Sequence, residues 1–143
     1  MANEGVRPCY VLDSFAMLAY FQNEPGCGQV TRLLERADAG ECHLAMCIVN
    51  LGEVVYNLER RSGMRAAQSA LARMNRMPVE VFDADRPLTL AAARFKVRFS
   101  IAYADCFAAA LAQAEKAAVV TGDPEFRKVE GEVAIEWLEK RNT

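Results

Sequence analysis

Two acidic residues interrupt otherwise apolar segments of the chain. Asp13 lies within Tyr-Val-Leu-Asp-Ser-Phe-Ala-Met at residues 10–17, and Asp105 lies within a run of almost wholly apolar or small residues at 103–112. A carboxylate that leaves water without a partner costs several kcal/mol. Both side chains therefore need a hydrogen-bond partner, a counter-charge or a bound ligand.

Two further acidic residues could join them in one site. Asp123 lies in a Gly-Asp-Pro turn, and Glu53 shares a polar helical face with Asn50 and Asn57, because residues three and four apart lie on the same side of a helix. Each acid also has an ordinary interpretation when taken singly. An aspartate at a helix start caps free amide groups, and a lone glutamate on a polar face is a surface residue.

The hydrophobic pattern predicts strands that alternate with helices. We expect strands at residues 9–12, 44–49, 79–82, 118–121 and 133–137. We expect helices at 14–21, 30–37, 51–58, 65–76 and 103–116, a helix from Asp85 or Thr89 to Phe95, and a brief helix after the turn at 122–124. Parallel strands need crossover connections, so this order implies a mainly parallel central sheet with helices on both faces. The prediction is one α/β domain over residues 1–143, a three-layer α/β/α sandwich.

In such a sheet the four acids would meet. The loops that leave the carboxyl ends of parallel strands share one edge, and ligands bind there at the switch point in strand order. Asp13, Glu53 and Asp123 each follow a predicted strand, and Asp105 opens a helix that leads into one. Converging carboxylates repel one another unless they share protons or cations. Their hard oxygen ligands suit Mg²⁺ or Mn²⁺, which can activate water for attack on a phosphodiester.

Four ordered segments of the chain resemble the PIN-domain family, and within it the small toxin ribonucleases of the VapC type. They are Tyr-Val-Leu-Asp-Ser at 10–14, Asn-Leu-Gly-Glu-Val at 50–54, the segment 103–112, and Thr-Gly-Asp-Pro-Glu-Phe at 121–126. The set spans nearly the whole chain. The resemblance implies a PIN-like fold and a metal-dependent endoribonuclease that uses Mg²⁺, with Mn²⁺ as a substitute.

The resemblance also implies the roles of individual residues. The acidic site, catalytic and metal-binding, consists of Asp13, Glu53, Asp105 and Asp123. Within it, Asp13 and Asp105 are the implied direct ligands, and Asp123 contributes directly or through water. The implied supporting residues are Ser14, Thr121 and Asn50. Of these, Asn50 departs from the serine or threonine that such domains commonly carry near that helix start.

Partners follow from the same resemblance. Similar toxins cut tRNA or ribosomal RNA, form homodimers, and are neutralised by a VapB-type antitoxin whose tail blocks the site with a basic side chain. The formal net charge of −2 provides no overall attraction to RNA. However, residues 58–98 hold nine basic and four acidic residues, against totals of 17 and 19. This segment is either a phosphate-binding rim or a set of solvated helix faces.

Composition places the chain among soluble proteins. Five cysteines at irregular spacing favour a reducing cytoplasm, and Cys42, His43 and Cys47 lack the second pair of ligands that structural zinc requires. The apolar run at 9–21 is broken by Asp13, and no segment approaches the roughly 20 apolar residues of a membrane-spanning helix. We expect a cytoplasmic protein with no membrane contact.

Three alternatives to a toxin nuclease remain. The same fold could serve as a catalytically inactive RNA-binding or assembly module, or as a housekeeping RNA-processing PIN nuclease, since such nucleases share the acids. Transfer through an aspartyl phosphate is the third. It is disfavoured because Asp13-Ser14-Phe15 lacks the second nearby carboxylate of such phosphatases.

Overall fold

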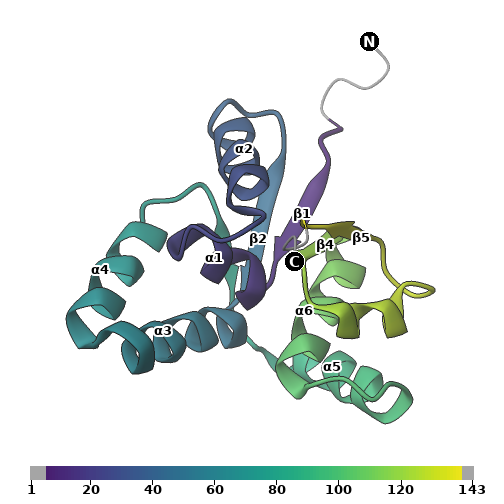
Figure 1. Cartoon of the computed structure of the whole chain (residues 1–143). Helices are drawn as coiled ribbons and strands as arrows, with labels where there is room; N and C mark the ends of the chain where they lie inside the picture. The colour runs from purple at the N-terminus through teal and green to yellow at the C-terminus, as the bar shows by residue number, and fades with distance from the viewer. Residues whose placement is uncertain (1–5, 140–143) are drawn as a thin grey trace.

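A five-stranded parallel sheet forms the centre of the computed structural model, which describes residues 6–139 (Figure 1). The strands are β1 (Cys9–Leu12), β2 (His43–Cys47), β3 (Glu80–Phe82), β4 (Ala118–Thr121) and β5 (Ile135–Trp137). Their order is β3-β2-β1-β4-β5, and every neighbouring pair is parallel. The predicted parallel α/β architecture is confirmed. The ends of the predicted domain, residues 1–5 and 140–143, lie outside the described part.

Helices cover both faces of this sheet. They are α1 (Ser14–Phe21), α2 (Cys27–Asp38), α3 (Ile48–Ser62), α4 (Met64–Met74), α5 (Arg86–Arg98), α6 (Tyr103–Glu115) and the 3₁₀ helix η1 (Pro124–Val129). Val11 and Val119 pack with α5, α6 and η1, whereas Leu12 and Val120 pack with α1 to α4. Neighbouring residues of a strand thus pack into the cores on opposite faces of the sheet, because side chains alternate across a strand. None of the helices in the described residues is long and apolar enough to span a bilayer.

Most predicted elements are present, and the differences lie at their ends. The predicted strand 44–49 is wrong at its end, because α3 begins at Ile48 directly after the extended Cys47. An apolar β-branched run fits a buried strand and a buried helix equally well, so its pattern does not reveal the transition. Of the two predicted starts of α5, Asp85 and Thr89, the structure shows the first. Asp85 caps the helix, and its carboxylate accepts a hydrogen bond of 3.0 Å from the Leu88 amide.

The strand order creates a switch point between β1 and β4. The chain moves from β1 outward through β2 to β3, and then returns to place β4 on the other side of β1. The Asp13 amide donates to the Val120 carbonyl at 3.4 Å, which ties the end of β1 to β4. The helices α1, α3 and α6 all have their N-termini at this carboxyl edge, where α/β proteins bind their ligands.

Candidate active site

Asp13 lies at the switch point and is only 1% exposed. Its carboxylate accepts a hydrogen bond of 2.9 Å from the Ala16 amide and caps α1, so the ordinary interpretation of an aspartate at a helix start holds here. Thr121 donates its hydroxyl hydrogen to the same carboxylate. The Thr121 oxygen in turn accepts from the Asp123 amide at 3.0 Å. One buried hydroxyl therefore connects the acids that follow β1 and β4.

Asp105 is different, because its side chain caps no helix and its one structural role is to oppose the positive end of the α6 dipole. The residue is 8% exposed in the first turn of α6, whose N-cap is Ala102 rather than the aspartate. Within residues 6–139 its carboxylate has no hydrogen-bond or ion-pair partner. The capping interpretation is therefore wrong for this residue. A nearly buried carboxylate without a partner is the strongest sign of a ligand site among residues 6–139.

Asp123 and Glu53 complete the acidic edge with half-buried side chains. Asp123 accepts a hydrogen bond of 2.9 Å from the Glu125 amide and caps η1. A carboxylate oxygen of Glu53 accepts from the Asn50 side-chain amide at 3.1 Å. Both acids thus keep part of the carboxylate free for another contact.

Asn50 lies on the same helical face as Glu53, as its spacing predicted, but this part of the face is buried rather than open to solvent. The side chain is fully buried, and its amide also donates to the Ala104 carbonyl at 3.2 Å, next to the start of α6. It caps no helix, because the N-cap of α3 is Cys47, which makes no side-chain cap bond. Asn50 therefore links Glu53 on α3 to the segment that carries Asp105.

Replacement of Asn50 with alanine should lower the free energy of unfolding by about 1–3 kcal/mol, since it removes two hydrogen bonds of a buried side chain, one of which joins α3 to α6. Asn57→Ala is the matched control, because the Asn57 amide bonds only to the Glu53 carbonyl within the same helix. Urea unfolding of both variants provides the measurement. Equal losses for the two variants would show that Asn50 does not hold α3 against α6.

The remaining predicted supporting residue, Ser14, directly follows Asp13 at the start of α1. Its side chain is half-buried and makes no hydrogen bond within the described part of the chain. The hydroxyl is therefore free to meet a ligand. Its supporting role remains a prediction.

Burial and mutual repulsion hold protons on the two most buried acids. Burial raises the pKa of Asp13 to about 8, and the charges of Asp105 and Asp123 add to this, against the bonds from Thr121 and Ala16. Burial likewise raises the pKa of Asp105 to about 7, helped by the charges of Asp123, Glu53 and Glu125 and opposed by Lys96. Asp105 therefore lies within electrostatic reach of the other three predicted site acids, Asp13, Glu53 and Asp123.

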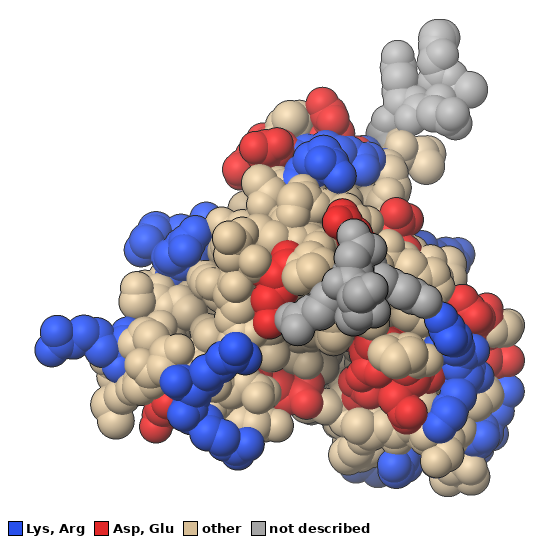
Figure 2. All heavy atoms as spheres, viewed as in Figure 1, with Lys and Arg blue, Asp and Glu red and all other residues tan. Residues whose placement is uncertain are grey.

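Basic residues do not neutralise this cluster. The ion pairs among the described residues are Arg36–Glu41, His43–Glu80, Arg98–Glu132 and Lys128–Glu125, and none includes a site acid. Lys96 donates to the Ile101 carbonyl at 2.6 Å instead. In Figure 2 acidic atoms appear near the middle of the face, with basic groups over α3 and α4 on one side and more on the other. All nine basic residues of the segment 58–98 have exposed side chains.

The donor set at this edge fits a hard divalent cation that keeps much of its water. Asp13 and Asp105 offer carboxylate oxygens, and the buried side-chain oxygen of Asn50 has no hydrogen-bond partner in the structure of residues 6–139. In the same residues no three Asp, Glu, His or Cys side chains form a group that could hold a metal by themselves. A closed cage of the zinc type is therefore absent there. Mg²⁺ needs no such cage, since it is typically held by one or two carboxylates plus water and substrate phosphate.

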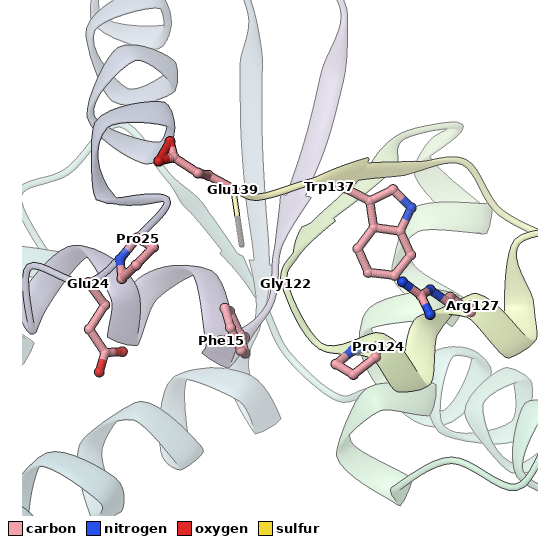
Figure 3. Close-up of a pocket in the computed structure, with 8 residues that line it drawn as sticks. All are labelled: Phe15, Glu24, Pro25, Gly122, Pro124, Arg127, Trp137 and Glu139. Atoms are coloured by element: carbon pink, nitrogen blue, oxygen red, sulfur yellow. The ribbon is translucent and has the colours of Figure 1, made fainter. Parts of the chain in front are cut away.

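A pocket of about 400 Å³, which the sequence pattern did not predict, lies beside the acids, and its walls include Phe15, Arg127 and Trp137 (Figure 3). These residues come from α1, η1 and the end of β5. The one tryptophan of the chain was a possible signal, but its position in the sequence does not indicate what it faces.

Comparison with known proteins supports the fold. The family model described as PIN domain matches residues 10–132. No curated protein sequence matches the chain.

Solved structures of low sequence identity share the architecture. VapBC2 from Rickettsia felis, bound to a DNA fragment from its promoter, has a TM-score of 0.74 at 20% identity over 92% of this chain and 99% of that chain. Mycobacterium tuberculosis VapC20, described as a sarcin-ricin loop cleaving toxin, has a TM-score of 0.68 at 22% identity over 82% and 92%. VapBC-1 from nontypeable Haemophilus influenzae has a TM-score of 0.69 at 17% identity over 90% and 97%.

Proposed function

The chain belongs to the PIN domain family, and on this premise we propose that it is a divalent-metal-dependent endoribonuclease, the toxin of a VapC-type toxin–antitoxin pair. The observation that carries the proposal is Asp105. This nearly buried carboxylate has no partner within the described residues, and it lies within electrostatic reach of Asp13, Glu53 and Asp123. Natural proteins rarely retain such a group without a use for it.

In this proposal each acid has a defined task. Asp13 and Asp105 hold Mg²⁺, or Mn²⁺ in its place, and Asp123 binds directly or through water. When bound, the ion supplies Lewis acidity toward the phosphate and lowers the pKa of a coordinated water. Thr121 and the Ala16 amide orient the Asp13 carboxylate through the hydrogen bonds described above.

Two further side chains can act on the attacking water and on the substrate. Glu53, held by Asn50, has a second carboxylate oxygen free to orient the attacking water. The Ser14 hydroxyl, at the N-terminus of α1, is placed to contact a phosphate oxygen, since helix N-termini favour anions. The chain needs no histidine or cysteine nucleophile for this chemistry.

The proposed substrate is a structured RNA, either tRNA or ribosomal RNA. A ribosomal substrate is supported by the similar fold of VapC20, whose description names the sarcin-ricin loop. The proposed partners are a VapB-type antitoxin, supported by the VapBC assemblies of similar fold, and a second copy of the chain. Five free cysteines favour action in a reducing compartment such as the cytoplasm.

Incubation of purified protein with tRNA and with a ribosomal RNA hairpin tests the proposal. We expect discrete cleavage with Mg²⁺ or Mn²⁺, and loss of cleavage in EDTA that added metal restores. Cleavage that persists in EDTA would reject a metal-dependent mechanism. RNA binding without cleavage in any metal would favour the inactive RNA-binding module, and activity without an antitoxin gene beside it would favour a housekeeping nuclease.

A further inference from the structure

The pocket beside the acidic edge is built from segments that also carry the acids. Phe15 follows Asp13 by two residues, and Gly122 and Pro124 flank Asp123 (Figure 3). The remaining walls come from η1, from the turn between α1 and α2, and from the end of β5 and the segment after it. Any group in this pocket therefore lies next to the position of a phosphate bound at the acids.

Two aromatic rings form walls of the pocket. The Phe15 side chain is 40% exposed and lies against the backbone of Gly122, where a Cβ atom would clash with the ring. Only glycine leaves room for the ring at this position. The Phe15 ring is therefore held at the pocket while one side stays open.

Trp137 lies across the pocket from Phe15 in Figure 3. Its indole N–H donates to a carboxylate oxygen of Glu130 at 2.9 Å, and its carbonyl accepts from the Gln29 side chain at 3.2 Å. These bonds fix the orientation of the ring, which packs against the core on one side and lines the pocket on another. A pre-oriented ring binds a flat partner at low entropic cost.

Charges in the pocket favour a base over a phosphate. Arg127 extends along the same wall as Trp137, and its guanidinium has no hydrogen bond or ion pair within the described residues. Glu24 and Glu139 also line the pocket, and their carboxylates would repel a phosphate. The edge of a nucleobase offers acceptors for the arginine and donors for the carboxylate of Glu139. Stacking of a base on an aromatic ring contributes about 1–3 kcal/mol.

We propose that this pocket is a base-binding subsite that holds one unpaired nucleobase of the RNA beside the phosphodiester to be cut. The inference rests on the proposed function, since it extends the same site. It predicts that the enzyme acts on loops or bulges rather than on continuous duplex, because a paired and stacked base cannot enter the pocket.

Trp137 provides a direct probe, because it is the only tryptophan in the chain. We expect a short single-stranded RNA of mixed sequence to quench its fluorescence saturably in EDTA, and an abasic strand of equal length not to do so. Phe15→Leu and Arg127→Gln should each weaken the Kd at least about fivefold. Arg32→Gln is the charge-matched control, because Arg32 is exposed on α2 and does not line this pocket.

The outcomes separate the subsite from the nuclease. Equal quenching by the abasic strand, or unchanged affinity in both pocket variants, would overturn the subsite even if the protein cuts RNA, and would leave the pocket to a peptide side chain or another ligand. Base-dependent quenching without any cleavage would support the subsite and reject the nuclease. Asp105→Asn should abolish cleavage and keep the quenching, because Asp105 does not line the pocket.

Discussion

Replacement of Asp105 with asparagine is expected to reduce RNA cleavage at least about a hundredfold, which corresponds to ~2.7 kcal/mol of lost transition-state stabilisation. Asparagine has nearly the same shape but brings no charge to a cation. The Asp105 carboxylate makes no hydrogen bond within residues 6–139, so the substitution breaks no structural contact there. Steady-state cleavage of a fluorescent RNA in Mg²⁺ gives the rate, and circular dichroism checks the fold.

A matched substitution elsewhere controls for the loss of one negative charge. Asp85→Asn changes an exposed aspartate that caps α5, and asparagine caps a helix as well as aspartate does. We expect the cleavage rate of this variant to remain within about twofold of the parent rate, which corresponds to a change of about 0.4 kcal/mol in activation free energy. Full activity of Asp105→Asn would remove the central residue of the proposed mechanism.

The metal-free protein is expected to lose stability as pH rises from about 5 to 8, opposite to ordinary acid denaturation. Burial raises the pKa of Asp13 to about 8 and that of Asp105 to about 7, from the ordinary aspartate pKa of 3.8. Between the unfolded and folded pKa values the native state therefore holds protons that the unfolded chain releases. Stability then falls by about 1.4 kcal/mol per pH unit for each proton retained.

Thermal unfolding in EDTA across this pH range measures the effect. Asp105→Asn should make the unfolding temperature depend less on pH and should raise the unfolding temperature at pH 8. The reason is that the variant lacks one of the two carboxyl groups that are protonated in the native state. Added Mg²⁺ or Mn²⁺ should stabilise the parent at pH 8 more than at pH 6, since a cation must displace the protons at the lower pH. A metal-free protein whose stability rises steadily from pH 5 to 8 would contradict this account.

Both predictions follow from one trade-off between the stability of the metal-free protein and its activity with metal. The acidic cluster destabilises the metal-free protein at neutral pH and is useful only with a cation. Asp105→Asn should therefore give a more stable and less active protein, whereas Asn50→Ala should give a less stable one. Opposite effects on stability from two neighbouring residues would separate the functional side chain from the structural one.

The elements near the switch point could be predicted from the sequence alone. β1 and α1 have the predicted ends, because Asp13 interrupts an apolar pattern and also caps the helix that follows. β4 and the turn into η1 were likewise predicted, since Gly122 and Pro124 break the pattern. The transition from β2 to α3 was misplaced because Ile48 and Val49 are apolar in either structure. Local patterns therefore locate elements well where a polar or conformationally special residue marks the boundary.

The acids of the candidate site were also found from the sequence, because Asp13 and Asp105 are the wrong residue types for buried positions. Which of them has a structural role was decided only in three dimensions. Asp13 caps α1 by accepting a hydrogen bond from the Ala16 amide, Asp105 has no partner within the described part, and Asn50 is buried between two helices. Phe15 and Trp137 form one pocket although 122 residues separate them. The periodicity of a sequence predicts which side of a local helix or strand is buried. A site instead depends on contacts between segments that are distant in the sequence, and only the tertiary structure brings these segments together.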